Sequence, residues 1–118
     1  MQLEQLDHVA LTVSDVERSI VWYRDVLELE RRHEEWGTEP AMMCTGDTCV
    51  ALFEGDGADT ALRHVAFRVN RENFERAQGE LREHGIEWQF FDHDTAYSIY
   101  FRDPDDHELE ITTYEIPS

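Results

Sequence analysis

The sequence has 118 residues, enough for one ordinary hydrophobic core and too few for two independent ones. Its 27 Asp and Glu residues against 10 Arg give a formal net charge of −17, which would repel a phosphate backbone and excludes nucleic acid as a partner. We find neither a signal peptide nor the run of about 18 apolar residues that a membrane span needs, and we expect a cytoplasmic protein with no membrane partner. The acidic surface suits a high-salt cytoplasm, with a basic partner as the alternative.

The first expected strand covers residues 6–13 and alternates in character. Val9, Leu11 and Val13 share the face that must cover a helix, which leaves His8 on the opposite face. A helix should follow, capped by Ser14 or Asp15. Its apolar residues recur at three- and four-residue spacing: Val16, Ile20, Tyr23 and Leu27.

Three strands are expected after this helix, at about 29–36, 41–45 and 49–54, separated by turn residues. If Gly46-Asp47 is a two-residue hairpin turn, Cys44 and Cys49 become cross-strand neighbours. In a cytosolic protein we expect these cysteines to be reduced.

The second half repeats the first at an offset of 56 residues. Residues 62–69 match residues 6–13 at five of eight positions, and His64 matches His8. A second helix should be capped by Asn70 and end at Gly85, and its apolar positions are Phe74, Ala77 and Leu81. Strands should follow at about 86–92, 96–102 and 107–114.

This pattern predicts an α+β fold with two βαβββ modules that form a curved, cup-shaped mixed β-sheet. We expect one domain over residues 1–118, with modules at about 4–55 and 60–116.

Alternation places polar groups on the helix-free face of the second module as well. His64 and Arg68 lie on that face, as do Ser98, Tyr100 and Glu110 on the later strands. If the two copies of the first strand lie side by side, His8 lies near His64, and Glu110 lies on a neighbouring strand.

Two imidazoles and a carboxylate suit one divalent ion: Fe(II), Mn(II), Ni(II) or Zn(II). We therefore predict that His8, His64 and Glu110 bind a metal. Tyr100, Ser98 and Arg68 are the candidate catalytic residues.

The motifs LDHVALTVSDVERSIVWYRDVL, HVAF and YFRDPDDHELEI resemble those of the vicinal oxygen chelate superfamily over nearly the whole chain. This superfamily includes glyoxalase I, bleomycin-resistance proteins, extradiol dioxygenases and fosfomycin-resistance thiol transferases. The resemblance implies the same ligands, His8, His64 and Glu110, and a small-molecule substrate whose vicinal oxygens the ion chelates. It also implies a homodimer in which the site can be shared between chains.

Within the superfamily we expect a glyoxalase-like lyase or isomerase, or an extradiol-type dioxygenase. A non-catalytic binder of the bleomycin-resistance type and a fosfomycin-type thiol transferase are the alternatives. The fourth ligand of glyoxalase I, a Glu in the first module, is missing, because Cys49, Ala51 and Phe53 take the inward positions and Glu54 is out of phase. Residues 89–94 are aromatic and acidic, which argues against a phosphonate substrate, and His93 is the candidate acid-base histidine of a dioxygenase.

Overall fold

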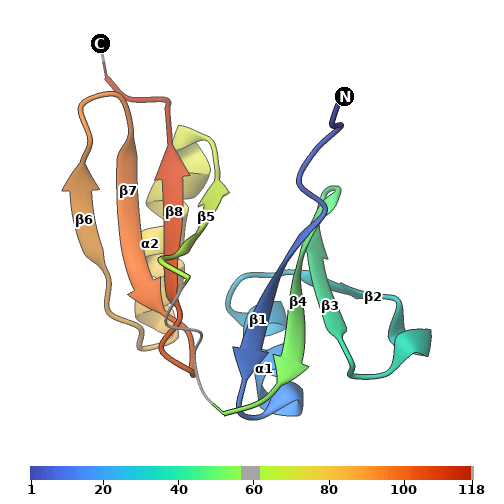
Figure 1. The fold of residues 1–118 in the computed structure, drawn as a ribbon. Coiled ribbons are helices and arrows are strands. Elements are labelled where there is room, and N and C mark those ends of the chain that lie inside the picture. The colour runs from blue at the N-terminus through green and yellow to red at the C-terminus, as the bar shows by residue number, and fades with distance from the viewer. Residues whose placement is uncertain (57–61, 118) are drawn as a thin grey trace. The chain divides into compact units, whose positions relative to one another are not determined.

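The computed structural model describes residues 1–56 and 62–117, and the chain divides into two units, Met1–Thr60 and Ala61–Ser118 (Figure 1). Each unit contains a four-stranded mixed sheet and one α-helix in the order βαβββ. The predicted α+β class with two βαβββ modules is therefore confirmed. The single-domain organisation stays a prediction, and the expected start of the second module at residue 60 lies outside the described residues.

Unit 1 pairs its strands in the order β1-β4-β3-β2, with β1 parallel to β4 and the remaining pairs antiparallel. Its helix begins after Asp15, whose carboxylate accepts a hydrogen bond from the Arg18 amide at 3.0 Å, as the capping pattern predicts. The elements are β1 (His8–Val13), α1 (Val16–Asp25), β2 (Glu30–Arg32), the 3-10 turn η1 (Glu34–Trp36), β3 (Ala41–Thr45) and β4 (Thr48–Glu54).

Strand β2 is shorter than the predicted range 29–36. It stops at Arg32 because His33 adopts a left-handed conformation, with φ +59°, and Glu34–Trp36 then forms η1. A left-handed histidine has no distinctive sequence signal, so the alternation alone overextended this strand.

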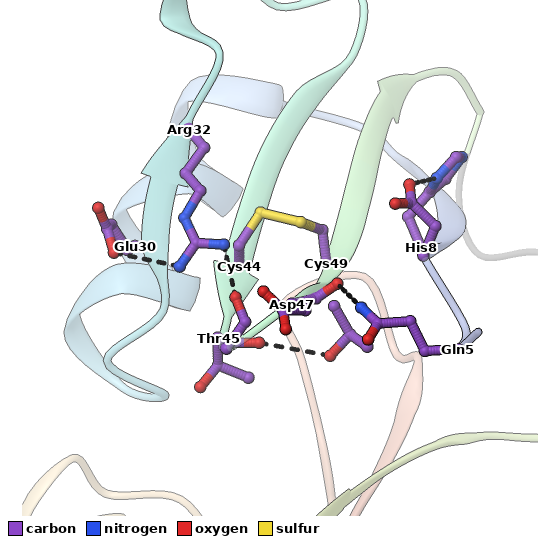
Figure 2. Close-up of a disulfide and its surroundings, with 11 residues drawn as sticks. Gln5, His8, Glu30, Arg32, Cys44, Thr45, Asp47 and Cys49 are labelled. Carbon is purple, nitrogen blue, oxygen red and sulfur yellow. Dashed lines mark hydrogen bonds and ion pairs between the residues drawn. A yellow bond between two sulfur atoms is a disulfide. The ribbon is translucent and has the colours of Figure 1, made fainter.

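The β3–β4 hairpin has the predicted register. Gly46 has φ +54°, and Thr45 pairs with Thr48 and Cys44 with Cys49. The two cysteines form a disulfide (Figure 2). The predicted cross-strand position of the two cysteines is therefore confirmed, and the expectation of a reduced pair is wrong for this structure.

Unit 2 has the strand order β5-β8-β7-β6, again with one parallel pair, β5 and β8. Asn70 caps its helix, accepting from the Asn73 amide at 2.9 Å, and Gly85 ends it with φ +71°. The elements are β5 (Val65–Arg68), α2 (Arg71–Glu83), β6 (Gln89–Asp92), β7 (Tyr97–Arg102) and β8 (Glu108–Thr113).

Strand β6 also begins later than the predicted 86–92. The Ile86 amide donates to the Leu81 carbonyl at 2.9 Å, which ties the chain to the end of α2 before it can join the sheet. The predicted core positions Phe74 and Leu81 of α2 are buried, as are Leu109 and Ile99 of the sheet. No helix of the described residues is long and apolar enough to cross a membrane.

Candidate metal and catalytic site

The strand register of unit 2 assembles a polar row on its helix-free face. Tyr100 of β7 pairs with Glu110 of β8, which pairs in turn with Ala66 of β5. One row along, Ser98 pairs with Thr112. Because lateral neighbours in a sheet point to the same side, these side chains share one face.

Glu110 is the centre of this row. Its Oε1 lies 3.1 Å from His64 Nε2, and its Oε2 accepts a hydrogen bond of 2.6 Å from the Ser98 hydroxyl. The Glu110 side chain is only 11% exposed, whereas that of His64 is 40% exposed. Thr112 Oγ1 lies 2.9 Å from Ser98 Oγ and 3.2 Å from the Tyr97 carbonyl, so its single proton can go to either oxygen while the Ser98 proton goes to Glu110.

Tyr100 lies beside this pair, with its ring edge-on to that of His64 at 5.9 Å between centroids. Its hydroxyl is 3.0 Å from His93 Nε2. Burial raises the pKa of Tyr100 above its ordinary value, and the negative charge of Glu110 raises it further. The phenol therefore stays protonated at neutral pH and can act as a hydrogen-bond donor.

Arg68, the third candidate catalytic residue, is directed elsewhere. Register pairs it with Thr112 on the same face, but its guanidinium lies over the Tyr114 ring, 4.7 Å from the centroid.

A groove of about 1070 Å³ adjoins Tyr100 in unit 2. Its walls come from the end of α2, the start of β6 and the end of β7. They include Arg82, Trp88, Gln89, Arg102 and Glu108. Tyr100 is one of its lining residues, and the volume is large enough for a small molecule.

His8 belongs to unit 1, where it opens β1. Its Nδ1 lies 2.8 Å from the Asp7 carboxylate (Figure 2). A carboxylate can only accept, so Nδ1 carries the proton and Nε2 of the neutral ring keeps its lone pair. Metal-bound histidines commonly have such a carboxylate partner on the other nitrogen. The sequence reasoning missed Asp7, although its position directly before His8 was a usable signal.

The pairing of β1 with β4 also shows why unit 1 has no carboxylate at the position that corresponds to Glu110. His8 pairs with Cys49 and Ala10 with Ala51. Ala51 is thus the counterpart of Glu110, which pairs with Ala66 in unit 2. Glu54 pairs with Val13 and lies on the helix side of the sheet.

Of the three predicted metal ligands, His64 and Glu110 contact each other within unit 2, and His8 lies in unit 1. Within residues 1–56 and 62–117, no three His, Cys, Asp or Glu side chains are gathered as a metal-binding group.

Comparison with known proteins gives one family. The model of the Glyoxalase/Bleomycin resistance protein/Dioxygenase superfamily matches residues 5–111. The chain is 31% identical over 115 residues to the glutathione transferase FosA of Serratia marcescens, covering 92% of this chain and 80% of that one. It is 28% identical over 121 residues to the metallothiol transferase FosB of Staphylococcus epidermidis, covering 96% and 84%. Among solved structures, the fosfomycin resistance protein FosX of Mesorhizobium loti has a TM-score of 0.73 and 26% identity, covering 95% and 93%.

Proposed function

The chain belongs to the Glyoxalase/Bleomycin resistance protein/Dioxygenase superfamily, and on that premise we propose that it is a metal-dependent enzyme that adds a thiol to an electrophilic small molecule. The predicted recognition is thereby confirmed, and the names of the relatives favour the thiol transferase alternative over the glyoxalase-like or dioxygenase reaction. The observation that carries the proposal is the His64–Glu110 pair, held by Ser98 beside a protonated tyrosine.

The donor set fits a divalent ion. His64 Nε2 and Glu110 Oε1 face each other at 3.1 Å, so a cation bound there would replace the proton between them. The Nδ1–H group of His8 donates to the Asp7 carboxylate, so Nε2 of the neutral ring keeps its lone pair for a metal. We propose His8, His64 and Glu110 as the ligands of one divalent ion. When bound, the ion supplies Lewis acidity that polarises an oxygen of the substrate.

The side chains around Glu110 do the positioning. The Ser98 hydroxyl holds Oε2, which leaves Oε1 directed at His64. Tyr100 keeps its proton, so it can donate a hydrogen bond to a substrate oxygen as negative charge develops there. His93 Nε2, 3.0 Å from the Tyr100 hydroxyl, can hold this hydroxyl in position.

The substrate should be uncharged or aromatic on the side that meets β6. Phe91 is 49% exposed and lies edge-on to Tyr100 at 5.5 Å between centroids. Asp92 pairs with Tyr97 and so faces the helix side of the sheet, and Asp94 lies in the turn that follows. Phe91 therefore supplies apolar contact, which favours an apolar epoxide or enone as the electrophile, and the acidic residues near this wall disfavour a phosphonate.

A dioxygenase is the second candidate, and the His93–Tyr100 contact favours it. A histidine hydrogen-bonded to a tyrosine can shuttle the protons that opening of a catechol ring requires.

The metal proposal is tested by elemental analysis of protein purified without chelator. We expect about one divalent ion per chain in the wild type, and loss of it in His8→Ala, His64→Ala and Glu110→Gln. Glu54→Gln is the matched control, because Glu54 lies 56 residues before Glu110 but faces the helix side. Retention of the ion in His64→Ala or Glu110→Gln at the wild-type level would remove that residue from the site.

The reaction is tested with the metal-loaded protein. Thiol consumption is measured with glutathione or cysteine and a panel of epoxides and enones, and oxygen consumption with catechols. Metal-dependent thiol consumption that Glu110→Gln abolishes supports the transferase. Oxygen uptake without thiol consumption would replace it with the dioxygenase, and ligand binding with neither activity would indicate a binding protein.

A further inference from the structure

The helix-free face of unit 1 carries a row of potential metal ligands, of which the proposed function uses His8 alone. Register pairs His8 of β1 with Cys49 of β4, and Cys49 with Cys44 of β3. Three metal-binding side chains therefore occupy adjacent strands on one face. Figure 2 shows the disulfide across β3 and β4, with the His8 ring turned away from the sulfurs toward its own hydrogen bond with Asp7.

We propose that the reduced form of this pair, together with His8, is a second binding site for a thiophilic divalent cation such as Zn²⁺, and that formation of the disulfide closes the site. The ligands would be Cys44 Sγ, Cys49 Sγ and one nitrogen of His8, with water in the remaining position. Two thiolates and an imidazole are a donor set that zinc prefers.

The sheet holds these groups in place without the sulfur–sulfur bond. Five register pairs join β3 to β4, from Ala41 with Leu52 to Thr45 with Thr48. Opposite Cβ atoms of such strands lie about 4.5–5.5 Å apart, so two thiolates can converge on one ion with Zn–S bonds near 2.3 Å. The His8 side chain is 47% exposed, so its ring has room to turn toward Cys49.

The opening reaction is thiol–disulfide exchange with a low-molecular-weight thiol. Cys49 is partly exposed while Cys44 is 1% exposed, so the incoming thiolate attacks Cys49 Sγ and Cys44 Sγ leaves as a thiolate. A second thiol molecule then releases Cys49 and leaves as the small-molecule disulfide. Two electrons and two protons pass to the protein, and the cation replaces the two thiol protons when it binds.

The site shares His8 with the proposed enzyme centre, so the test uses a variant that lacks the other two ligands of that centre. In His64→Ala/Glu110→Gln, only the cysteine site remains. The protein is reduced with a phosphine, the phosphine is removed without air, and Cd²⁺ is titrated as the probe. We expect one Cd²⁺ per chain with thiolate-to-metal charge-transfer absorption in the ultraviolet, and no such absorption in the oxidised protein.

Three further variants in the same background separate the ligands. Cys44→Ser and Cys49→Ser should each lose the charge-transfer band of a dithiolate site, and His8→Ala should weaken Cd²⁺ binding about tenfold or more. His33→Ala is the matched control, because His33 is a half-exposed histidine of the same unit that stacks on Trp36. In the reduced protein, bound Cd²⁺ should also slow alkylation of both cysteines by iodoacetamide.

The proposal is overturned if the reduced protein binds Cd²⁺ no better than the oxidised one. If His8→Ala and His33→Ala bind Cd²⁺ equally well, His8 is not a ligand of this site. Failure of the enzyme centre to hold metal would leave this result unaffected, since the background variant already lacks that centre.

Discussion

Ser98→Ala tests how much the hydrogen bond from the Ser98 hydroxyl to Glu110 contributes to stability and to metal binding. Ser98 is 1% exposed, and its hydroxyl lies 2.6 Å from Glu110 Oε2. A hydrogen bond to a charged group contributes about 1.5–3 kcal/mol, and the variant leaves a mostly buried carboxylate oxygen without this donor. We therefore expect the free energy of unfolding of the metal-free protein to fall by about 2 kcal/mol. Metal affinity should fall about 10- to 100-fold, as when a partner that orients a ligand is removed.

Ser19→Ala is the matched control for this change. Ser19 is equally buried, at 0% exposed, but its hydroxyl makes no hydrogen bond within the described residues. Since it lies inside α1, alanine should leave stability unchanged or raise it by a few tenths of a kcal/mol. Urea unfolding followed by circular dichroism, in excess chelator, measures both variants. Equal unfolding free energies for Ser98→Ala and Ser19→Ala would refute the role given to the Ser98 hydroxyl.

Three more predictions concern the β7–β8 turn, Tyr100 and assembly. Asp103→Ala should lower the free energy of unfolding by about 3 kcal/mol, because the Asp103 carboxylate accepts from the amides of Asp105 and His107 and contacts the His107 ring at 2.7 Å; Asp106→Gly, at φ +67°, should not destabilise. In ultraviolet titration, Tyr100 should ionise above pH 10, and Tyr100→Phe should remove that phase. Because the folded-state pKa is raised, the Tyr100 contribution to stability is full below pH 10 and is lost as pH rises through the folded pKa, so Tyr100→Phe should flatten that decline; an unchanged slope would contradict it. Sedimentation equilibrium should give a homodimer, and a monomer at all concentrations would end that expectation.

Local alternation was enough to predict most of the unit 2 row. Ser98, Tyr100 and Glu110 are two residues apart or cross-strand partners, and the period of two assigns each to a face without knowledge of the rest of the fold. The helix caps Asp15 and Asn70 were predictable for the same reason, since a cap depends on a few neighbouring residues.

Features that depend on backbone exceptions or on chemistry outside the chain were not predictable. The left-handed conformation of His33 ends β2, although no glycine marks this position in the sequence. The hydrogen bond from the Ile86 amide to the Leu81 carbonyl makes β6 begin later than predicted. The hairpin register brings Cys44 and Cys49 together whether they are oxidised or reduced, so the sequence pattern does not distinguish the two states. The expectation of reduced cysteines rested on a cytosolic location, and the disulfide was therefore not predicted. The contact between His93 and Tyr100 depends on the turn after β6, whose conformation alternation does not encode.

The packing around Ala51 limits how far the first half of the chain can come to resemble the second at the proposed metal site. Ala51 is 0% exposed and lies in an apolar cluster with Met42 and Cys44, whereas its counterpart Glu110 has Ser98 to receive it. A glutamate introduced at Ala51 would bring an unpartnered charge into that cluster, at a cost of several kcal/mol. A single substitution therefore cannot turn the first half into a copy of the second, and a symmetric, four-ligand descendant of this protein would first have to rebuild the neighbourhood of that alanine.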